Sequence, residues 1–349
     1  MLNHYFRKSN TPNSKTSLSR RLFFRQTGAA IFTTAFLTSC SDLLDKIDPG
    51  KSEEEKEPEE QLPPRDKTLA FFGDSLTIGA GGSAPYGTFV GAALPERTII
   101  SDGIVGQFAK SGSVMQGGTP LTISIDGDKF NGVVPVDVTK MSNQFLSTFS
   151  NNREYSRSGT LAGVKCRITR TGSEEFGEKY TVLPDVESME SVPPDSVFQL
   201  DEVEKLRSAT QIFWYGRNNI GRPGAEEEII TALDNSIAYI TEPARFLVVG
   251  ILLSAKERPG NEKYNEVMAI NDRLASKYGK SYVPMTQPTA EEMAAIGYTP
   301  SEQDQADLAN NDFPAGMRAD VNNDEIHLND MGYKIVANRV VAKIKELKY

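Results

Sequence analysis

A run of four apolar residues, Leu69-Ala70-Phe71-Phe72, constrains the fold of this chain more than any other segment. Short continuous apolar runs are typical of parallel strands that are covered on both faces. Gly73-Asp74-Ser75 follows this run, at the carboxyl end of the expected strand. Further strands are expected over 97–101, 211–215 and 246–253, and each of the first two also ends in a glycine-containing segment.

Between these expected strands, apolar residues recur at the spacing of amphipathic helices. One such pattern covers 230–240 and another covers 336–344, near the end of the chain. Strands that alternate with helices predict an open, mostly parallel sheet with helices on both faces. We therefore expect an α/β domain over 67–349.

The segment at about 118–206 interrupts this alternation. It contains strand-forming stretches over 121–125, 133–138, 162–171 and 179–183, and the turn Asp126-Gly127 follows the first of them. This pattern predicts an antiparallel, β-rich insertion. Because it enters after the second strand and leaves before the third, it is expected near the carboxyl edge of the sheet, where such sheets bind ligands. Both a lid or substrate platform and a purely stabilising insertion fit the pattern.

Residues 1–39 have the layout of an export signal, with a basic stretch, an uncharged run and a short processing site. The uncharged run is too short to span a bilayer stably. Ser19-Arg20-Arg21-Leu22-Phe23-Phe24 resembles a twin-arginine motif, and Leu37-Thr38-Ser39-Cys40 resembles a bacterial lipobox, in which Cys40 is lipidated. The alternative is an amphipathic extension with a chance cysteine. Residues 40–66, rich in Glu, Lys, Pro and Asp, are expected to form a tether.

Charge and cysteine content limit the partners of the chain. Its formal charge is -9, and removal of the six basic residues before Cys40 lowers it to about -15, which disfavours nucleic acid and anionic lipid surfaces. Once Cys40 is lipidated, Cys166 is the only thiol, and the alternation around it predicts a small core residue. Ser41 after Cys40 lacks the aspartate of inner-membrane lipoproteins, so the resemblance favours anchoring in the outer membrane of a host that has one.

Four short elements follow one another in the chain and carry side chains suited to acyl transfer. They are Gly73-Asp74-Ser75-Leu76, Gly103-Ile104-Val105-Gly106, Gly216-Arg217-Asn218 and Asp324-Glu325-Ile326-His327. His327 is the only histidine outside the expected signal, and histidine is the usual base beside a serine nucleophile. Asp324, three residues earlier, could orient its ring, and Ser75 could be the nucleophile.

The order and content of these elements resemble the four signature blocks of the SGNH or GDSL hydrolase superfamily. This resemblance implies a flavodoxin-like three-layer α/β/α fold with about five parallel strands, and a serine esterase without a cofactor or metal. It implies the triad Ser75, His327 and Asp324. It also implies an oxyanion hole made of the backbone N–H groups of Ser75 and Gly106 and the side-chain amide of Asn218.

One position departs from the family pattern. The third block commonly continues Asn-Asp, whereas this chain has Asn218-Asn219, so the support around the oxyanion donor is expected to differ. Asp74, Arg217 and Asn219 are candidate substrate-binding residues. Arg217 either faces a substrate that bears negative charge or points to solvent.

Other functions fit parts of the sequence less well. Gly79-Ala80-Gly81-Gly82-Ser83-Ala84 matches a dinucleotide fingerprint with Asp102 at the distance of a ribose ligand, but it lies about six residues beyond the strand end and does not open a helix. The segment 320–324 resembles the start of a calcium loop, yet its sixth and twelfth positions are Glu325 and Met331. A single histidine without a cysteine cluster argues against zinc.

The sequence thus predicts an exported, lipid-anchored serine ester hydrolase of the cell envelope. Its expected substrate is an O-acetylated glycan or a small ester, because the chain is acidic and expected to be exported. The polar insertion, with little contiguous apolar surface for long acyl chains, argues against a lipase. The alternatives are a lipase or phospholipase of the same fold and a lipid-anchored binding protein that has lost activity.

Overall fold

The computed structural model describes residues 66–143, 145–146, 153–173, 177–320 and 323–349. The predicted export signal, the lipidation at Cys40 and the tether up to residue 65 lie outside these residues. Among the residues that are described, no helix is long and apolar enough to cross a membrane.

Five parallel strands form the central sheet, in the order β11-β10-β9-β1-β2. They are β1 (Leu69–Gly73), β2 (Ile99–Gly103), β9 (Thr210–Trp214), β10 (Phe246–Val249) and β11 (Tyr282–Val283). Counted along the chain, this is the 2-1-3-4-5 order of flavodoxin-like sheets, so the predicted fold class is confirmed. The strand expected over 246–253 ends at Val249, although the loop residues 251–253 are buried as well, because apolar burial does not require strand pairing.

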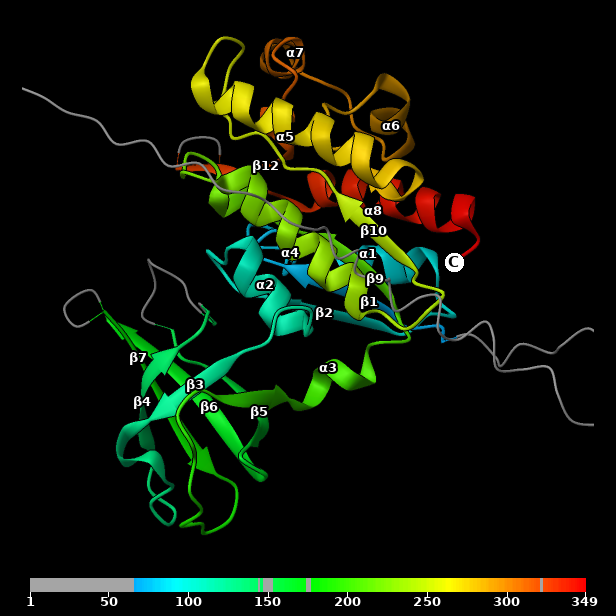
Figure 1. The fold of residues 1–349 in the computed structure, drawn as a ribbon. Coiled ribbons are helices and arrows are strands. Elements are labelled where there is room, and N and C mark those ends of the chain that lie inside the picture. Colours follow the sequence, from blue (N-terminus) through cyan, green and yellow to red (C-terminus); the bar gives the residue numbers. More distant parts are fainter. Residues whose placement is uncertain (1–65, 144, 147–152, 174–176, 321–322) are drawn as a thin grey trace, which may run out of the picture. The chain divides into compact units, whose positions relative to one another are not determined.

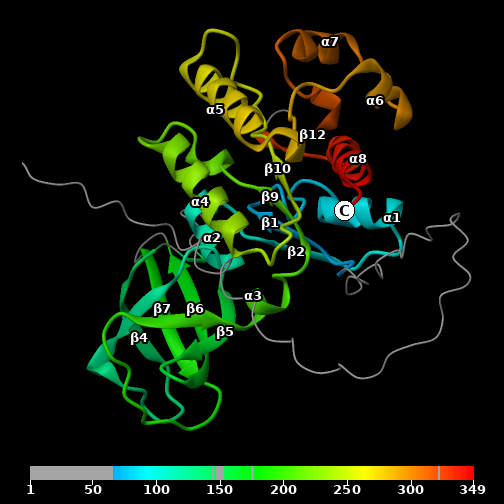
Figure 2. The ribbon, with the colours of Figure 1, turned by 45° about the vertical axis from the view of Figure 1, so that its right-hand side comes forward.

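Helices cover both faces of this sheet (Figures 1 and 2). Leu69 and Phe71 of β1 share an apolar cluster with α1 (Tyr86–Ala93) and α8 (Asp330–Leu347). The alternate side chains, Ala70 and Phe72, share another cluster with α4 (Ala225–Tyr239) and α5 (Glu262–Tyr278), and α2 (Ala109–Gln116) packs against α4 on this side. The alternation of strand side chains thus divides the core into two layers.

The shorter helices lie outside these layers. They are α3 (Asp201–Lys205), α6 (Ala290–Ala295) and α7 (Glu302–Ala309). Helices α6 and α7 each begin with a reciprocal capping box, formed by Thr289 with Glu292 and by Ser301 with Asp304. A two-stranded antiparallel hairpin, β12 (Arg318–Asp320) and β13 (Asp324–Leu328), follows them and leads into α8.

Between α2 and α3 the chain forms a closed barrel of six antiparallel strands in the order β3-β4-β7-β6-β5-β8. The strands are β3 (Thr122–Ile125), β4 (Val136–Met141), β5 (Tyr155–Leu161), β6 (Val164–Ser173), β7 (Gly177–Pro184) and β8 (Ser196–Leu200). Buried apolar side chains, including Phe130, Cys166 and Phe198, fill its interior. The same cluster contains Ile104 and Met115 of the α/β part, so the barrel core extends to the loop after β2 and to α2.

Candidate active site

Ser75 lies in a tight turn directly after β1. The Leu76 N–H donates to the Asp74 carboxylate at 2.9 Å, and the Ala80 N–H donates to the Ser75 carbonyl at 2.9 Å. Gly73 is required before this turn, because a Cβ there would lie 2.2 Å from Thr77 Oγ1 and 2.5 Å from the Trp214 carbonyl. The strand end and the turn therefore fix the direction in which the Ser75 hydroxyl points.

The structure brings Ser75, His327 and Asp324 into one hydrogen-bonded line. His327 Nε2 lies 2.7 Å from Ser75 Oγ, and His327 Nδ1 lies 2.7 Å from Asp324 Oδ2. An ionised carboxylate only accepts hydrogen bonds, so Nδ1 carries a proton and donates it to Asp324. In the neutral ring Nε2 is then free to accept the Ser75 proton, which is the arrangement of a nucleophile, its base and the group that orients the base.

Asp324 holds His327 through the backbone as well as through the ring. Its Oδ1 accepts from the N–H of His327 at 2.9 Å and from the N–H of Ile326 at 3.0 Å. Partial burial acts to raise the pKa of Asp324, but these donors and the imidazole outweigh it and lower the pKa below its usual value. The carboxylate is therefore ionised at neutral pH and can stabilise a protonated ring.

The three predicted oxyanion donors differ in their hydrogen bonding. The backbone N–H groups of Ser75 and Gly106 have no acceptor among the described residues. Gly106 has a φ of 76°, a left-handed conformation that favours glycine. The Asn218 amide donates to Asp74 Oδ2 at 2.9 Å and to the Gln107 carbonyl at 3.0 Å, so a substrate oxygen has to compete with these acceptors.

The three candidate substrate-binding residues are buried and bind other residues of the chain. Asp74 is 2% exposed, and burial raises its pKa to about 6. Asn219 accepts from the Ala109 N–H at 3.0 Å and donates to Glu228 at 2.8 Å. Asp74 supports Asn218, and Asn219 connects the loop after β9 with α2 and α4.

For Arg217 the predicted alternative of a side chain that points to solvent is wrong. Its guanidinium makes two hydrogen bonds to Glu257, of 2.8 and 2.6 Å, and a third to the Leu252 carbonyl at 2.7 Å. The side chain is 7% exposed. Its positive charge is satisfied internally by Glu257, a residue 40 positions away that no local motif identified.

The glycine run that matched a dinucleotide fingerprint packs against the β12–β13 hairpin. A Cβ on Gly81 would lie 2.4 Å from the Ala319 Cβ and 3.0 Å from the His327 Cβ. Ser83 binds the Asp330 carboxylate through both its N–H and its hydroxyl, each at 2.7 Å. The run thus connects the turn of Ser75 with the start of α8. Asp102, which has the sequence distance of a ribose ligand in that fingerprint, is bound by Arg157 of the barrel at 2.5 Å.

The calcium-like segment also has a different arrangement. Both carboxylate oxygens of Asp324 are directed to His327 and Ile326, and Asn323 donates to the Asp320 carboxylate at 2.9 Å. No group of three or more His, Cys, Asp or Glu side chains that could hold a metal occurs in the part of the chain that is described.

Comparisons with known proteins give a fold likeness only. No protein-family model and no curated protein matches the chain. A proposed lipolytic protein of the G-D-S-L family from Desulfitobacterium hafniense is 8% identical, with a TM-score of 0.40, over 79% of this chain and 99% of that one. A proposed acylhydrolase from Bacteroides fragilis is 12% identical, with a TM-score of 0.41, over 83% of this chain and 93% of that one.

A proposed lipase from Chitinophaga pinensis is similar at the same level, with 11% identity and a TM-score of 0.37 over 80% of this chain and 98% of that one. At these values the likeness carries no argument about activity. What can be said of this chain itself is that it is a flavodoxin-like α/β protein with an inserted barrel. A serine, a histidine and an aspartate are aligned at the carboxyl edge of its parallel sheet.

Proposed function

We propose that this chain is a serine ester hydrolase of the SGNH type that works through an acyl-enzyme. The observation that carries the proposal is the unbroken line from Ser75 Oγ to His327 Nε2 and from Nδ1 to Asp324, with both contacts at 2.7 Å. Such a line is what a serine hydroxyl needs in order to lose its proton as it attacks a carbonyl.

In the proposed reaction, His327 takes the proton of Ser75 while Oγ forms a bond to the ester carbonyl carbon. The carbonyl oxygen becomes an oxyanion, which the N–H groups of Ser75 and Gly106 and the amide of Asn218 would stabilise. His327 then gives the proton to the departing alcohol, and an acyl-Ser75 remains. Water, deprotonated by His327, releases the acid and restores the hydroxyl.

We propose an O-acetylated glycan or another small ester as the substrate. Ser75 is only 5% exposed, which favours a small acyl group over a bulky one. The insertion nevertheless carries exposed apolar side chains. Val133, Val134, Val186 and Met189 are each at least 51% exposed, and Gly132 and Ser188 pair so that their two segments are adjacent. This surface favours the alternative, a lipid ester as substrate.

We also propose that the protein is exported and anchored at the cell envelope through lipidated Cys40. This part rests on residues 1–40, whose twin-arginine and lipobox patterns stand in the correct order. Incorporation of radiolabelled palmitate that is lost in a Cys40→Ser variant would support it, whereas an unlabelled wild-type protein in the soluble fraction would contradict it.

The hydrolase is tested by labelling with a fluorophosphonate and by hydrolysis of acetyl, butyryl and lauryl esters. We expect the wild-type protein to label, Ser75→Ala to be silent, and the rate to fall as the acyl chain lengthens. A rate that rises with chain length would favour the lipid ester, and acetate release from acetylated glycans would then be absent. A folded wild-type protein that neither labels nor hydrolyses any ester would instead indicate a binding protein.

A further inference from the structure

Two buried ion pairs connect the loop that carries Asn218 with the hairpin that carries Asp324 and His327. The first is Arg217–Glu257, whose side chains are 7% and 5% exposed. The second is Arg318–Asp312, whose side chains are 2% and 0% exposed. Neither pair includes a residue of the proposed triad or oxyanion hole.

The first pair ties the loop after β9 to the loop after β10. Arg217 precedes Asn218 directly, and its guanidinium binds both carboxylate oxygens of Glu257, at 2.8 and 2.6 Å. Glu257 also accepts from the Ser254 N–H at 2.9 Å, and Arg217 donates to the Leu252 carbonyl at 2.7 Å. A two-pronged contact of this kind fixes orientation as well as distance.

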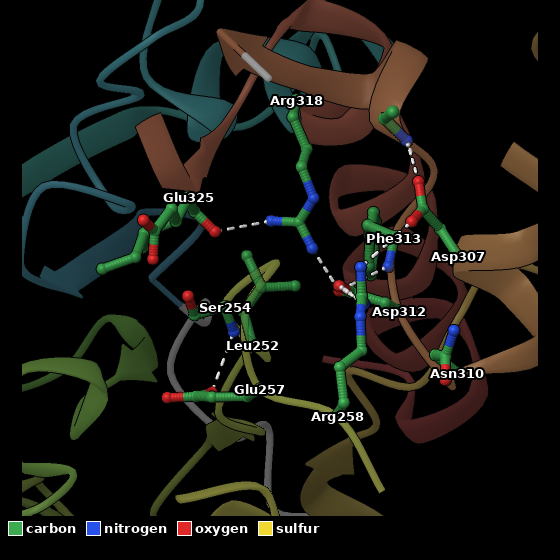
Figure 3. A network of polar contacts seen from close by, with 12 residues as sticks. Leu252, Ser254, Glu257, Arg258, Asp307, Asn310, Asp312, Phe313, Arg318 and Glu325 are labelled. Carbon is green, nitrogen blue, oxygen red and sulfur yellow. Dashed lines mark hydrogen bonds and ion pairs between the residues drawn. The ribbon is translucent and has the colours of Figure 1, made fainter. Parts of the chain in front are cut away.

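The loop after β10 in turn holds the strand of the proposed base. The Ala255 N–H donates to the Glu325 carbonyl at 2.8 Å. Arg318 donates to the same carbonyl at 2.8 Å. Glu325 lies between Asp324 and His327 in sequence, so its peptide is held from two directions, as Figure 3 shows for the Arg318 contact.

The second pair closes the connection. Asp312 accepts from Arg318, from the Phe313 N–H at 2.8 Å and from Arg258 at 2.9 Å (Figure 3). Arg258 directly follows Glu257, so the chain of contacts returns to the loop where it began. Burial outweighs the two guanidinium groups and raises the pKa of Asp312 to about 6.

We propose that Arg217–Glu257 and Arg318–Asp312 are positioning pairs that hold the strand of Asp324 and His327 in register with the loop of Asn218. The inference rests on the proposed hydrolase for its kinetic consequence. Buried ion pairs contribute little net stability over apolar pairs of similar volume, whereas a displacement of about 1 Å in a catalytic group can cost roughly 100-fold in rate. The pairs therefore act on geometry more than on the stability of the fold.

The kinetic test replaces each pair by apolar residues, in Arg217→Met/Glu257→Leu and in Arg318→Met/Asp312→Leu. We expect melting temperatures below the wild type, because backbone groups that these side chains bind are left unpaired, in folded variants whose kcat values are lower by about 100-fold and whose KM changes by less than about threefold. Arg339→Met/Glu292→Leu is the matched control, because Arg339 binds both carboxylate oxygens of Glu292, at 2.6 and 2.7 Å, away from the proposed site. Its kcat should equal that of the wild type.

An NMR measurement tests the positioning role of the two ion pairs independently of ester hydrolysis. His327 is the only histidine after Cys40, so the Nδ1 proton that it shares with Asp324 gives an assignable downfield NMR signal. We expect this signal to shift or broaden in both double variants and to stay in place in the control. If a double variant fails to fold, Arg217→Lys and Arg318→Lys replace it. These variants keep the positive charge but lose the two-pronged guanidinium contact, and they should show a smaller shift of the same NMR signal.

The outcomes are distinguishable. A wild-type protein that hydrolyses no ester contradicts the hydrolase, and the NMR signal then decides about the two pairs on its own. The inference is overturned if the signal stays unchanged in the folded variants, or if kcat in an active protein remains within about twofold of the wild type.

Discussion

Asp324 and His327 are three residues apart in one strand, and this proximity shapes the chemistry that they can carry out. One carboxylate oxygen receives the His327 N–H and the other faces the ring, so the short segment orients its own base. Ser75, in contrast, is 252 residues away from His327 and is brought to 2.7 Å only by the fold.

The first residue-scale prediction concerns the unequal roles of the base and its orienting group. We expect His327→Ala to lower kcat by about 10⁶-fold and Asp324→Asn by roughly 10⁴-fold, because the base moves the proton whereas the carboxylate only directs and stabilises it. Steady-state hydrolysis of a small ester measures both. Equal decreases of kcat in the two variants would contradict these unequal roles.

The second residue-scale prediction concerns pH and stability. The pKa of Asp324 is lowered in the folded protein, so its ionised form stabilises the fold at pH values above the unfolded pKa of about 3.9. This contribution is lost as pH falls through the folded pKa. The melting temperature of Asp324→Asn should therefore lie below that of the wild type at pH 7, and the gap should close below about pH 4. A difference in melting temperature that stays constant from pH 7 to pH 3 would contradict a stabilising role of the ionised Asp324.

At the scale of elements, the turn after β1 and the β12–β13 hairpin meet at the glycine run. Gly81 has a φ of 89° and lies against Ala319 and His327, so a side chain there would push the hairpin away from Ser75. The same run that resembled a nucleotide loop in the sequence is thus a packing surface. Only the neighbours of these glycines, which come from the other end of the chain, distinguish the two interpretations.

We therefore predict that Gly81→Ala lowers kcat by about 100-fold through displacement of His327. Gly163→Ala is the control, because Gly163 has a similar φ of 82° but a Cβ added there would meet no atom within 4 Å. Gly163→Ala should lose about 1–2 kcal/mol of stability through backbone strain, and Gly81→Ala should lose more, because its added Cβ also clashes with Ala319. Equal kcat values in the two variants would show that the hairpin does not depend on this contact.

At the scale of the whole molecule, the apolar core of the barrel extends into the α/β part. Ile104, in the loop after β2, and Met115 of α2 belong to the same apolar cluster as the barrel residues Ile168 and Phe198. Arg157 of β5 adds an ion pair to Asp102 at the end of β2. Separate unfolding of the barrel would expose the apolar side chains of both parts, so we expect the described domain to unfold as one unit.

Two natural probes test this expectation. Trp214, the only tryptophan, is 1% exposed in β9 of the sheet, and Cys166 is fully buried in the barrel, where burial raises the pKa of its thiol to about 12. In a Cys40→Ser variant, tryptophan fluorescence and thiol reactivity should change at the same urea concentration. Thiol reactivity that rises at clearly lower urea would indicate an independently unfolding barrel.

The sequence by itself determined the local features of this protein. Short continuous apolar runs specify strands that are covered on both faces, and apolar residues at helical spacing specify amphipathic helices. This is why the parallel sheet and its helices could be predicted. The sequence also marked Ser75, Asn218, Asp324 and His327 as polar residues at strand ends. Their identities are local, but only the four motifs together, in their order along the chain, indicated a hydrolase.

Only the tertiary structure decided which distant residues meet. The closure of the barrel depends on β3 pairing with β8, and the burial of Arg217 and Arg318 depends on Glu257 and Asp312. A charged side chain has the same local sequence signature whether it faces solvent or a buried partner, because its environment is supplied by segments far away in the chain. For that reason Arg217 was misplaced in the sequence interpretation, whereas the alignment of Ser75 with His327 needed the fold to bring the two ends of the chain together.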